Sequence, residues 1–139
     1  MNQPLYTRDI LRLAASIPHQ AALADPQGIA ALRSPTCGAM MTVAVTLGDD
    51  GRVAALSQSV SACAFGQATA ALMGQGAIGR DEQEARAALD AVQCWLSGDD
   101  VDPWPGFDAL EPARTKAGRH GAIMLPFRAL LAAIEDAAR

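Results

Sequence analysis

The clearest periodic pattern in the chain is an alternation of apolar and smaller or polar residues over positions 40–47. Large apolar side chains occupy every second position, namely Met41, Val43, Val45 and Leu47. A period of two is typical of a strand with one buried face. The next four residues, Gly48-Asp49-Asp50-Gly51, are a turn signal. Residues 52–60 are therefore predicted to return as an antiparallel partner strand, and a short strand is predicted at 29–33.

Helical periodicity dominates the rest of the chain. Helices are predicted over residues 7–17, 63–75, 81–96 and 107–113, and a last helix carries Ile123, Leu130, Leu131 and Ile134 toward Arg139. Asp81 is the best start signal, because it can cap a helix whose first turn also carries Glu82 and Glu84. Pro126 fits only the first turn of the last helix or a kink in it. His120 is therefore expected at or just before the start of that helix.

This order of elements indicates the α+β class. One helix precedes the strands and the remaining helices follow them, which predicts a small antiparallel sheet of two to three strands covered by helices. The chain has 139 residues, the length of one domain. We therefore expect residues 1–139 to form a single domain.

Composition narrows the classes of partner. The net charge is −4, and the 11 Lys and Arg residues form no basic stripe, which argues against nucleic acid. The most apolar window, residues 60–79, is interrupted by polar residues and glycines, so no membrane span is expected. The first residues lack the charged and apolar regions of a secretion signal. With three cysteines, an odd number, these features lead us to expect free thiols in the cytoplasm.

Cys63 lies where the second hairpin strand gives way to a helix of small residues. Backbone N–H groups at a helix start have no intrahelical partner and carry partial positive charge, which favours a thiolate over a thiol. A thiolate is the form that binds soft metals and accepts sulfur. The alternative explanation is a small cysteine that only packs in the core.

Cys37 and His120 extend this candidate site. Cys37 lies between Pro35 and Gly38, on a constrained loop just before the first hairpin strand. Because the hairpin is antiparallel, that loop and Cys63 are expected at one end of the sheet. Two thiolates and an imidazole suit zinc and iron–sulfur clusters. The spacing is no Cys-x-x-Cys motif, however, and a surface or helix-capping role for His120 is the alternative.

Other residues of reactive types are assigned structural roles. Cys94 lies in mid-helix beside Trp95 and is interpreted as a partly buried structural thiol. His19 follows a proline in a loop and is interpreted as solvated. Trp95 and Trp104 are interpreted as packing residues.

Short motifs follow one another in a fixed order over nearly the whole chain. They are Leu5-Tyr6 with Asp9-Ile10-Leu11, Ser34-Pro35-Thr36-Cys37-Gly38, Asp50-Gly51-Arg52-Val53, Ala62-Cys63-Ala64 with Ala68-Thr69-Ala70-Ala71-Leu72, Leu96-Ser97-Gly98 and Arg119-His120. With these motifs the chain resembles the U-type iron–sulfur cluster assembly scaffolds, namely IscU, SufU and the N-terminal domain of NifU.

The resemblance implies a small antiparallel sheet covered by helices and a function as a platform. On such platforms a cysteine desulfurase deposits sulfur, and iron is assembled into a [2Fe–2S] cluster for apo recipient proteins; some members instead hold zinc and accept persulfide. Carried over, Cys37 and Cys63 match two thiolate ligands and candidate sulfur acceptors, and His120 matches the histidine ligand. Arg119, at the edge of the site, would offset the charge of an anionic cluster.

Three positions depart from the family pattern. Ala39, beside Gly38, stands at the position of an aspartate ligand, and Gly121 stands at the position of the third cysteine. The family's chaperone-recognition stretch, Leu-Pro-Pro-Val-Lys, is replaced by Glu111-Pro112-Ala113-Arg114. Three protein ligands leave a four-coordinate site one short. Water, a partner or a second subunit in a homodimer would have to supply the fourth ligand.

These departures favour an alternative within the same fold. In it the chain is a divergent member that acts as a zinc-bound sulfur acceptor, or as a docking module for a cysteine desulfurase with no stable metal. A third interpretation is an enzyme with a Cys–His nucleophile. It is disfavoured because the sequence shows no orienting third group and no oxyanion-hole motif. The chain is accordingly predicted not to be an enzyme.

Overall fold

The computed structural model describes residues 6–35 and 38–139 and confirms the predicted α+β class. In chain order the elements are α1 (Arg8–Ala14), β1 (Gly28–Arg33), β2 (Met40–Leu47), β3 (Val53–Ser61), α2 (Ala64–Gly76), α3 (Glu82–Leu96), the 3₁₀ helix η1 (Phe107–Ala113) and α4 (Ala117–Ala137). None of the helices in this described part is long and apolar enough to cross a membrane.

The three strands form one antiparallel sheet in the order β1-β2-β3. Along β2, Met41, Val43 and Val45 are buried, whereas Met40 and Thr42 are exposed. The predicted alternation is therefore confirmed, and the buried face is the one that the helices cover. The predicted hairpin between β2 and β3 is confirmed as well.

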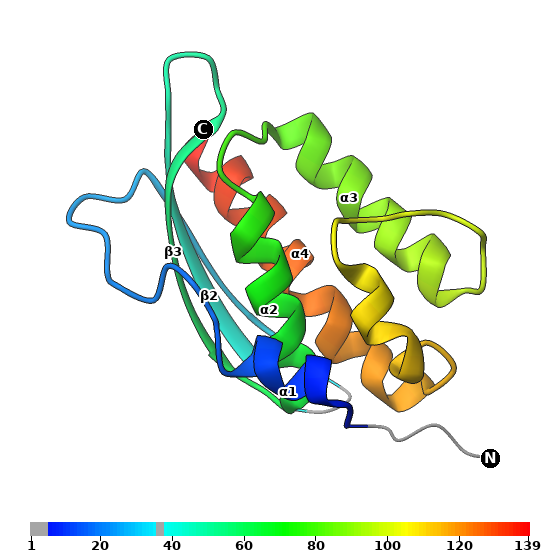
Figure 1. Ribbon diagram of the computed structural model, residues 1–139. Coiled ribbons are helices and arrows are strands. Elements are labelled where there is room, and N and C mark those ends of the chain that lie inside the picture. Colours follow the sequence, from blue (N-terminus) through cyan, green and yellow to red (C-terminus); the bar gives the residue numbers. More distant parts are fainter. Residues whose placement is uncertain (1–5, 36–37) are drawn as a thin grey trace.

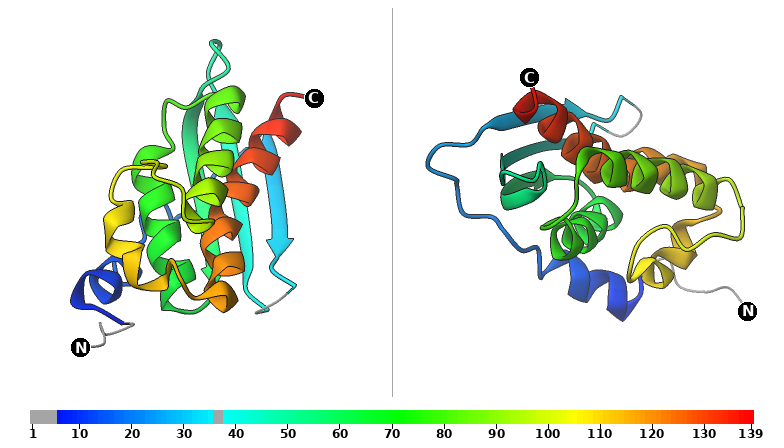
Figure 2. Two further views of the ribbon diagram at one scale, coloured as in Figure 1. Left: turned by 90° about the vertical axis from the view of Figure 1, so that its right-hand side faces the viewer. Right: turned by 90° about the horizontal axis from the view of Figure 1, so that it is seen from above.

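The labelled helices lie on one side of the sheet, in two layers (Figures 1 and 2). α4 packs on β1 and β2, and α2 packs beside it on β3. α1 covers α2, α3 covers α4, and η1 contacts α1, α2 and α4. Gly28 lets β1 pass directly beneath α4, because a Cβ atom at this position would overlap the carbonyl oxygen of Ala133.

Two helix starts follow their sequence signals. Thr7 caps α1 by accepting a hydrogen bond from the Ile10 N–H at 3.2 Å. Asp81 caps α3 in a capping box with Glu84, as its position predicted. α1 stops at Ala14, earlier than the predicted residue 17, and the chain then crosses α2 and β3.

Pro18 explains this early end of α1. Its ring lies so close to α2 that a Cβ atom at Gly74 would be 2.8 Å from the Pro18 Cγ. Its carbonyl oxygen accepts a hydrogen bond from Nε2 of the buried Gln58 at 3.0 Å. These contacts hold Pro18 against α2 and β3.

The last helix corrects the sequence prediction. α4 starts at Ala117, so His120 is its fourth residue and Pro126 lies well inside it. A proline has no N–H to donate to the carbonyl of the residue four positions earlier, which here is Ala122. That carbonyl faces α2 at close range, since a Cβ atom built at Gly66 would lie 3.6 Å from the Ala122 oxygen. Packing against α2 thus accommodates a proline that local rules exclude from a helix interior.

Candidate functional site

The sheet register brings two of the predicted ligand segments together. Met40, the first residue of β2, pairs with Ser61, the last residue of β3. Gly38 and Ala39 precede Met40, and Cys63 follows Ser61 by two residues. Both segments therefore lie at the same end of the sheet, as the hairpin predicted. Cys37 itself lies outside the described residues.

The part of the loop that is described is tightly closed. The Ser34 N–H donates to the Ala39 carbonyl at 2.8 Å, and the Gly38 N–H donates to the Ser34 carbonyl at 3.0 Å. Gly38 has φ +71°, a left-handed conformation that glycine adopts without strain. Ala39 is only 3% exposed and belongs to the hydrophobic core. The position of the family's aspartate thus holds a buried methyl group that provides no ligand.

Cys63 occupies the N-cap of α2 as a free thiol. Its backbone is extended, with φ −67° and ψ 174°, and its carbonyl accepts the first helical hydrogen bond from the Gln67 N–H at 2.9 Å. The side chain is half-buried at the edge of the core and makes no capping hydrogen bond. Cys63 is thus a partly exposed residue at a helix start, where the first backbone N–H groups have no helical partner.

His120 is half-buried in the first turns of α4, and its ring is held by a backbone group. Nε2 lies 2.8 Å from the carbonyl oxygen of Arg114. A carbonyl oxygen only accepts hydrogen bonds, so Nε2 donates and the lone pair of the neutral ring is on Nδ1. Metal-binding histidines are commonly oriented in this way, by a hydrogen bond from the nitrogen that does not bind the metal.

A close contact between α2 and α4 sets the spacing of the site. Gly66 lies three residues after Cys63, and Ala122 lies two residues after His120. A Cβ atom at Gly66 would be 3.4 Å from the Ala122 Cβ and 2.6 Å from the Ala62 Cβ. The overlap with Ala62 requires glycine at this position, whereas the distance to Ala122 is an ordinary van der Waals contact between α2 and α4. Their contact brings the beginnings of both helices to the same end of the molecule (Figure 1).

An aromatic and cationic cluster, formed by Tyr6, Phe65 and Arg119, borders the candidate ligands. The rings of Tyr6 and Phe65 stack with centroids 5.3 Å apart. The Arg119 guanidinium lies 5.7 Å from the Phe65 centroid, and its Nη2 lies 3.4 Å from the Tyr6 hydroxyl oxygen. Sequence reasoning placed Arg119 at the edge of the site but gave no role to Tyr6 and Phe65. The available signals were that Tyr6 belongs to a matched motif and that Phe65 directly follows another.

Other residues of reactive types lie outside this site. Cys94 is exposed on α3, so its interpretation as a partly buried thiol is wrong. It follows Val92, whose side chain faces the core, by two residues, and therefore turns toward solvent. His19 is exposed, as predicted, and has φ +61°. Within the described ranges no group of three or more His, Cys, Asp and Glu side chains is arranged to hold a metal ion.

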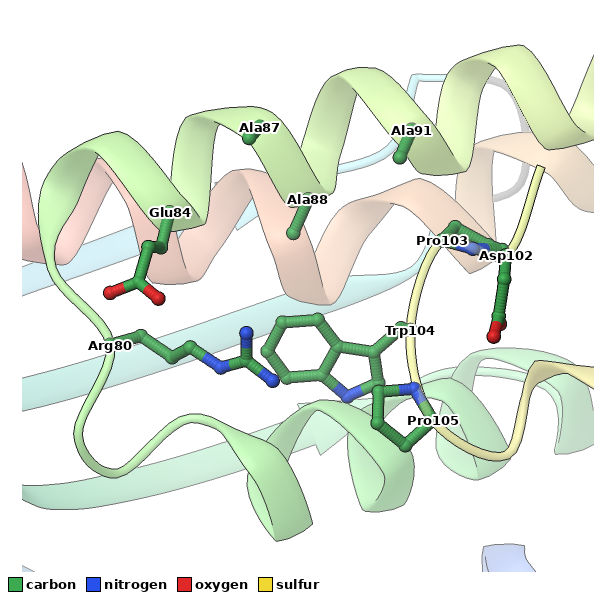
Figure 3. Close-up of a pocket in the computed structure, with 9 residues that line it drawn as sticks. All are labelled: Arg80, Glu84, Ala87, Ala88, Ala91, Asp102, Pro103, Trp104 and Pro105. Atoms are coloured by element: carbon green, nitrogen blue, oxygen red, sulfur yellow. The ribbon is translucent and has the colours of Figure 1, made fainter.

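A groove of about 390 Å³ lies between α3 and the loop at residues 99–106 (Figure 3). Its walls are Ala87, Ala88 and Ala91 on one side and the loop on the other. Trp104 fills the floor; its Nε1 donates to the Leu72 carbonyl at 2.7 Å, and the Arg80 guanidinium stacks on its ring at 4.3 Å. The predicted packing role of Trp104 is confirmed. Neither Cys63 nor His120 lines this groove.

The structure is similar to the crystal structures of two other proteins. A nitrogen-fixing NifU-like protein (N-terminal) from Brucella abortus has a TM-score of 0.87 and 31% sequence identity, over 96% of this chain and 94% of that chain. A proposed iron–sulfur cluster assembly scaffold protein for the SUF system from Fervidobacterium islandicum has a TM-score of 0.78 and 18% identity, over 94% of this chain and 96% of that chain. At 18% identity the second likeness concerns the fold alone.

Sequence comparisons add no further relatives. No protein-family model matches the chain, and no curated protein sequence matches it. The similarity to the Brucella protein, which spans nearly all of both chains, therefore carries the assignment.

Proposed function

The chain belongs to the family of U-type scaffolds that includes the NifU-like N-terminal domain, and on that premise we propose that it carries iron–sulfur cargo through Cys37, Cys63 and His120. The cargo is a [2Fe–2S] cluster or the persulfide sulfur from which a cluster is built. Membership of a scaffold family also sets aside the interpretation of Cys63 and His120 as a catalytic pair: the chain is not an enzyme.

The observation that carries the proposal is the arrangement of two soft donors at one end of the fold. The hairpin register sets Gly38 and Ala39, just before β2, beside the end of β3, and the Gly66–Ala122 contact joins the beginnings of α2 and α4. Cys63 supplies a solvent-accessible sulfur, and His120 supplies a ring nitrogen whose lone pair is kept free by the bond to Arg114. Thiolate and imidazole are suited to iron and zinc.

Sulfur transfer follows from the same groups. A cysteine desulfurase presents its sulfur as an enzyme-bound persulfide. The Cys63 thiolate attacks the outer sulfur of that persulfide and forms a new S–S bond, while the desulfurase sulfur leaves as a thiolate. The thiol proton of Cys63 passes to a base, for which we propose Nδ1 of His120, on the helix that begins at the same end of the molecule as α2. No external oxidant or reductant is required, because the sulfane sulfur only changes its thiol partner.

Three protein ligands leave one coordination position for another donor. Ala39 is buried and apolar and Gly121 has no side chain, so neither supplies it. We propose that a second copy of the chain, or the desulfurase or recipient that exchanges cargo with it, completes the site. A ligand set completed by a partner favours transient holding, which suits a carrier that must release its cargo.

Metal and sulfide analysis tests the proposal. The protein is purified without oxygen as wild type, Cys63→Ser and Cys94→Ser, and iron, zinc, acid-labile sulfide and the visible spectrum are measured. Cys94→Ser is the matched control, since it removes an exposed thiol outside the site. We expect iron and sulfide in near-equal amounts in the wild type and in Cys94→Ser, and neither in Cys63→Ser. Equal contents in all three proteins would contradict the assignment of Cys63.

A second candidate function is favoured by Ala39 and Gly121, the two positions without ligands. In this alternative the chain docks a cysteine desulfurase and accepts sulfur around zinc, or holds no metal at all. Zinc without sulfide in the purified protein would favour the zinc-bound acceptor. Absence of metal after reconstitution, together with normal desulfurase affinity of a Cys37→Ser, Cys63→Ser double variant, would favour the docking module.

A further inference from the structure

The ring of His120 is bonded to a residue that lies outside the family's ligand pattern. Arg114 follows η1 and precedes His120 by six residues, across the turn that leads into α4. Its carbonyl oxygen accepts a hydrogen bond from Nε2 of His120 at 2.8 Å. The tautomer of the histidine is therefore linked to the position of one peptide group in this turn.

The side chain of Arg114 is clamped to the C-terminal end of α3. Its Nε donates to the Trp95 carbonyl oxygen at 2.7 Å, and its Nη2 donates to the Asp99 carbonyl oxygen at 2.5 Å. The guanidinium carbon also lies 4.7 Å from the centroid of the Trp95 ring, within the range of a cation–π contact. The Arg114 side chain is 21% exposed; its bond to Trp95 is partly buried, and its bond to Asp99 lies at the surface.

The clamp has a geometry that only arginine provides. The planar guanidinium directs two of its N–H groups to two carbonyl oxygens while its face covers an indole ring. The ion pair with Glu111, at 3.6 Å, is much weaker because the Glu111 side chain is 55% exposed. Contacts with α3 thus hold the backbone of Arg114. His120 lies at the other end of the turn that follows Arg114.

We infer that Arg114 is a positioning residue for His120. By fixing its own carbonyl group against α3, it holds the imidazole as the Nε2–H tautomer and leaves Nδ1 as the nitrogen that binds cargo or takes a thiol proton. The role of Nδ1 in cargo binding rests on the proposed function. The tautomer of His120 and the contacts of the Arg114 side chain with α3 are independent of that function.

The chain offers controls that separate positioning from charge. Arg114→Lys keeps the positive charge but loses the planar fork. Arg119→Ala removes a positive charge directly beside His120 and leaves the Arg114 clamp intact. His19 is an internal reference, because it is an exposed loop histidine whose ring lies away from this clamp.

Nitrogen NMR of the histidine rings in the metal-free protein is the test. In the wild type we expect His120 to show one tautomer, with the proton on Nε2 and protected from exchange with water, whereas the ring protons of His19 exchange. In Arg114→Ala and Arg114→Lys the protected proton should be lost, and in Arg119→Ala it should remain. Circular dichroism checks that each variant is folded.

Two results would overturn the inference. One is a wild-type His120 whose ring behaves like that of His19, a comparison that needs no variant to fold. The other is a folded Arg114→Lys protein that keeps the protected Nε2 proton.

Titration with Zn²⁺ alone separates this inference from the proposed function. We expect the Nδ1 resonance of His120 to change on zinc binding while the Nε2 proton stays in place. Zinc bound through Nε2 would overturn the positioning role. A wild-type protein that binds neither zinc nor iron would count against the proposed function, and the metal-free spectra would still decide the role of Arg114.

Discussion

Two helices of this fold begin in opposite ways. α3 begins at Asp81, whose carboxylate accepts from the Glu84 N–H at 2.8 Å, while the Glu84 carboxylate accepts from the Asp81 N–H at 3.3 Å. Arg52, from the β2–β3 hairpin, adds an ion pair with Glu84 at 2.6 Å. α2 begins at Cys63, whose side chain caps nothing.

The contrast shows how one structural feature serves two purposes. At α3 the helix start is satisfied within the chain, and the result is stability. α2 starts at Cys63, and cysteine is a poor N-cap. The backbone N–H groups of the first turn are therefore left to interact with the cysteine sulfur. Local stability is given up where the proposed chemistry takes place.

Cys63→Ser is expected to have the largest effect. It should favour the stability of the α2 start over the proposed chemistry there. Serine is a good N-cap, so the variant should be at least as stable as the wild type, with up to about 1 kcal/mol gained. Sulfur uptake at position 63 should nevertheless be lost. Chemical denaturation and a sulfur-transfer assay with a cysteine desulfurase measure the two effects. A variant that loses stability and keeps sulfur uptake would contradict the comparison.

Gly66→Ala should disturb the site through packing. The added methyl group meets the Ala62 and Ala122 side chains, and overpacking of this kind costs about 1–3 kcal/mol. The segment at Ala62 and Cys63 should move relative to α2, because the overlap is with Ala62, and cargo retention should fall with it. Gly118→Ala in α4 is the control, since a Cβ atom there has no neighbour within 4 Å. Equal stability and cargo retention in the two variants would refute the proposed role of the contact.

Asp81→Ala should affect stability alone. It removes the capping box of α3, which is expected to cost about 1 kcal/mol. Because α3 contributes no candidate ligand, the metal and sulfide content of the folded variant should equal that of the wild type. Thermal denaturation together with cargo analysis checks both statements. Loss of cargo in a folded Asp81→Ala protein would show that the two helix starts are not independent.

Arg52→Gln should have the smallest effect. The hydrogen bond and negative charge of Glu84 raise the pKa of the Arg52 guanidinium. A raised pKa in the folded state adds stability at every pH below the ordinary arginine pKa, so the contribution is constant through the neutral and mildly alkaline range. The pair is exposed, and its effect should shrink further at about 1 M salt, where the Debye length is about 3 Å. Urea denaturation at low and high salt measures this; a large loss independent of salt would contradict it.

Local signals in the sequence predicted much of the fold. The alternation over 40–47 and the turn after it give β2 and the hairpin, and the charges around Asp81 give the start of α3. Each of these signals lies within a few residues of the element that it predicts.

Features that depend on distant segments could not be predicted. Pro126 lies inside α4, in a stretch whose Ala122 packs against Gly66 of α2, a segment distant in sequence. The bond between His120 and Arg114 depends on how the end of α3 holds a turn that is remote from it in sequence. The hairpin pattern predicted which segments share one end of the sheet, whereas the tautomer of the His120 ring could be assigned only from the structure.

The most direct test of the central claim is to locate the transferred sulfur. Intact wild-type, Cys63→Ser and Cys94→Ser proteins are incubated with a cysteine desulfurase and cysteine, and the modified residue is mapped by mass spectrometry. We predict a mass increase of one sulfur atom on Cys63 in the wild type and in Cys94→Ser, and none at position 63 in Cys63→Ser. Sulfur found only on Cys94, or not found on the wild-type protein, would contradict the assignment of Cys63 as a sulfur acceptor.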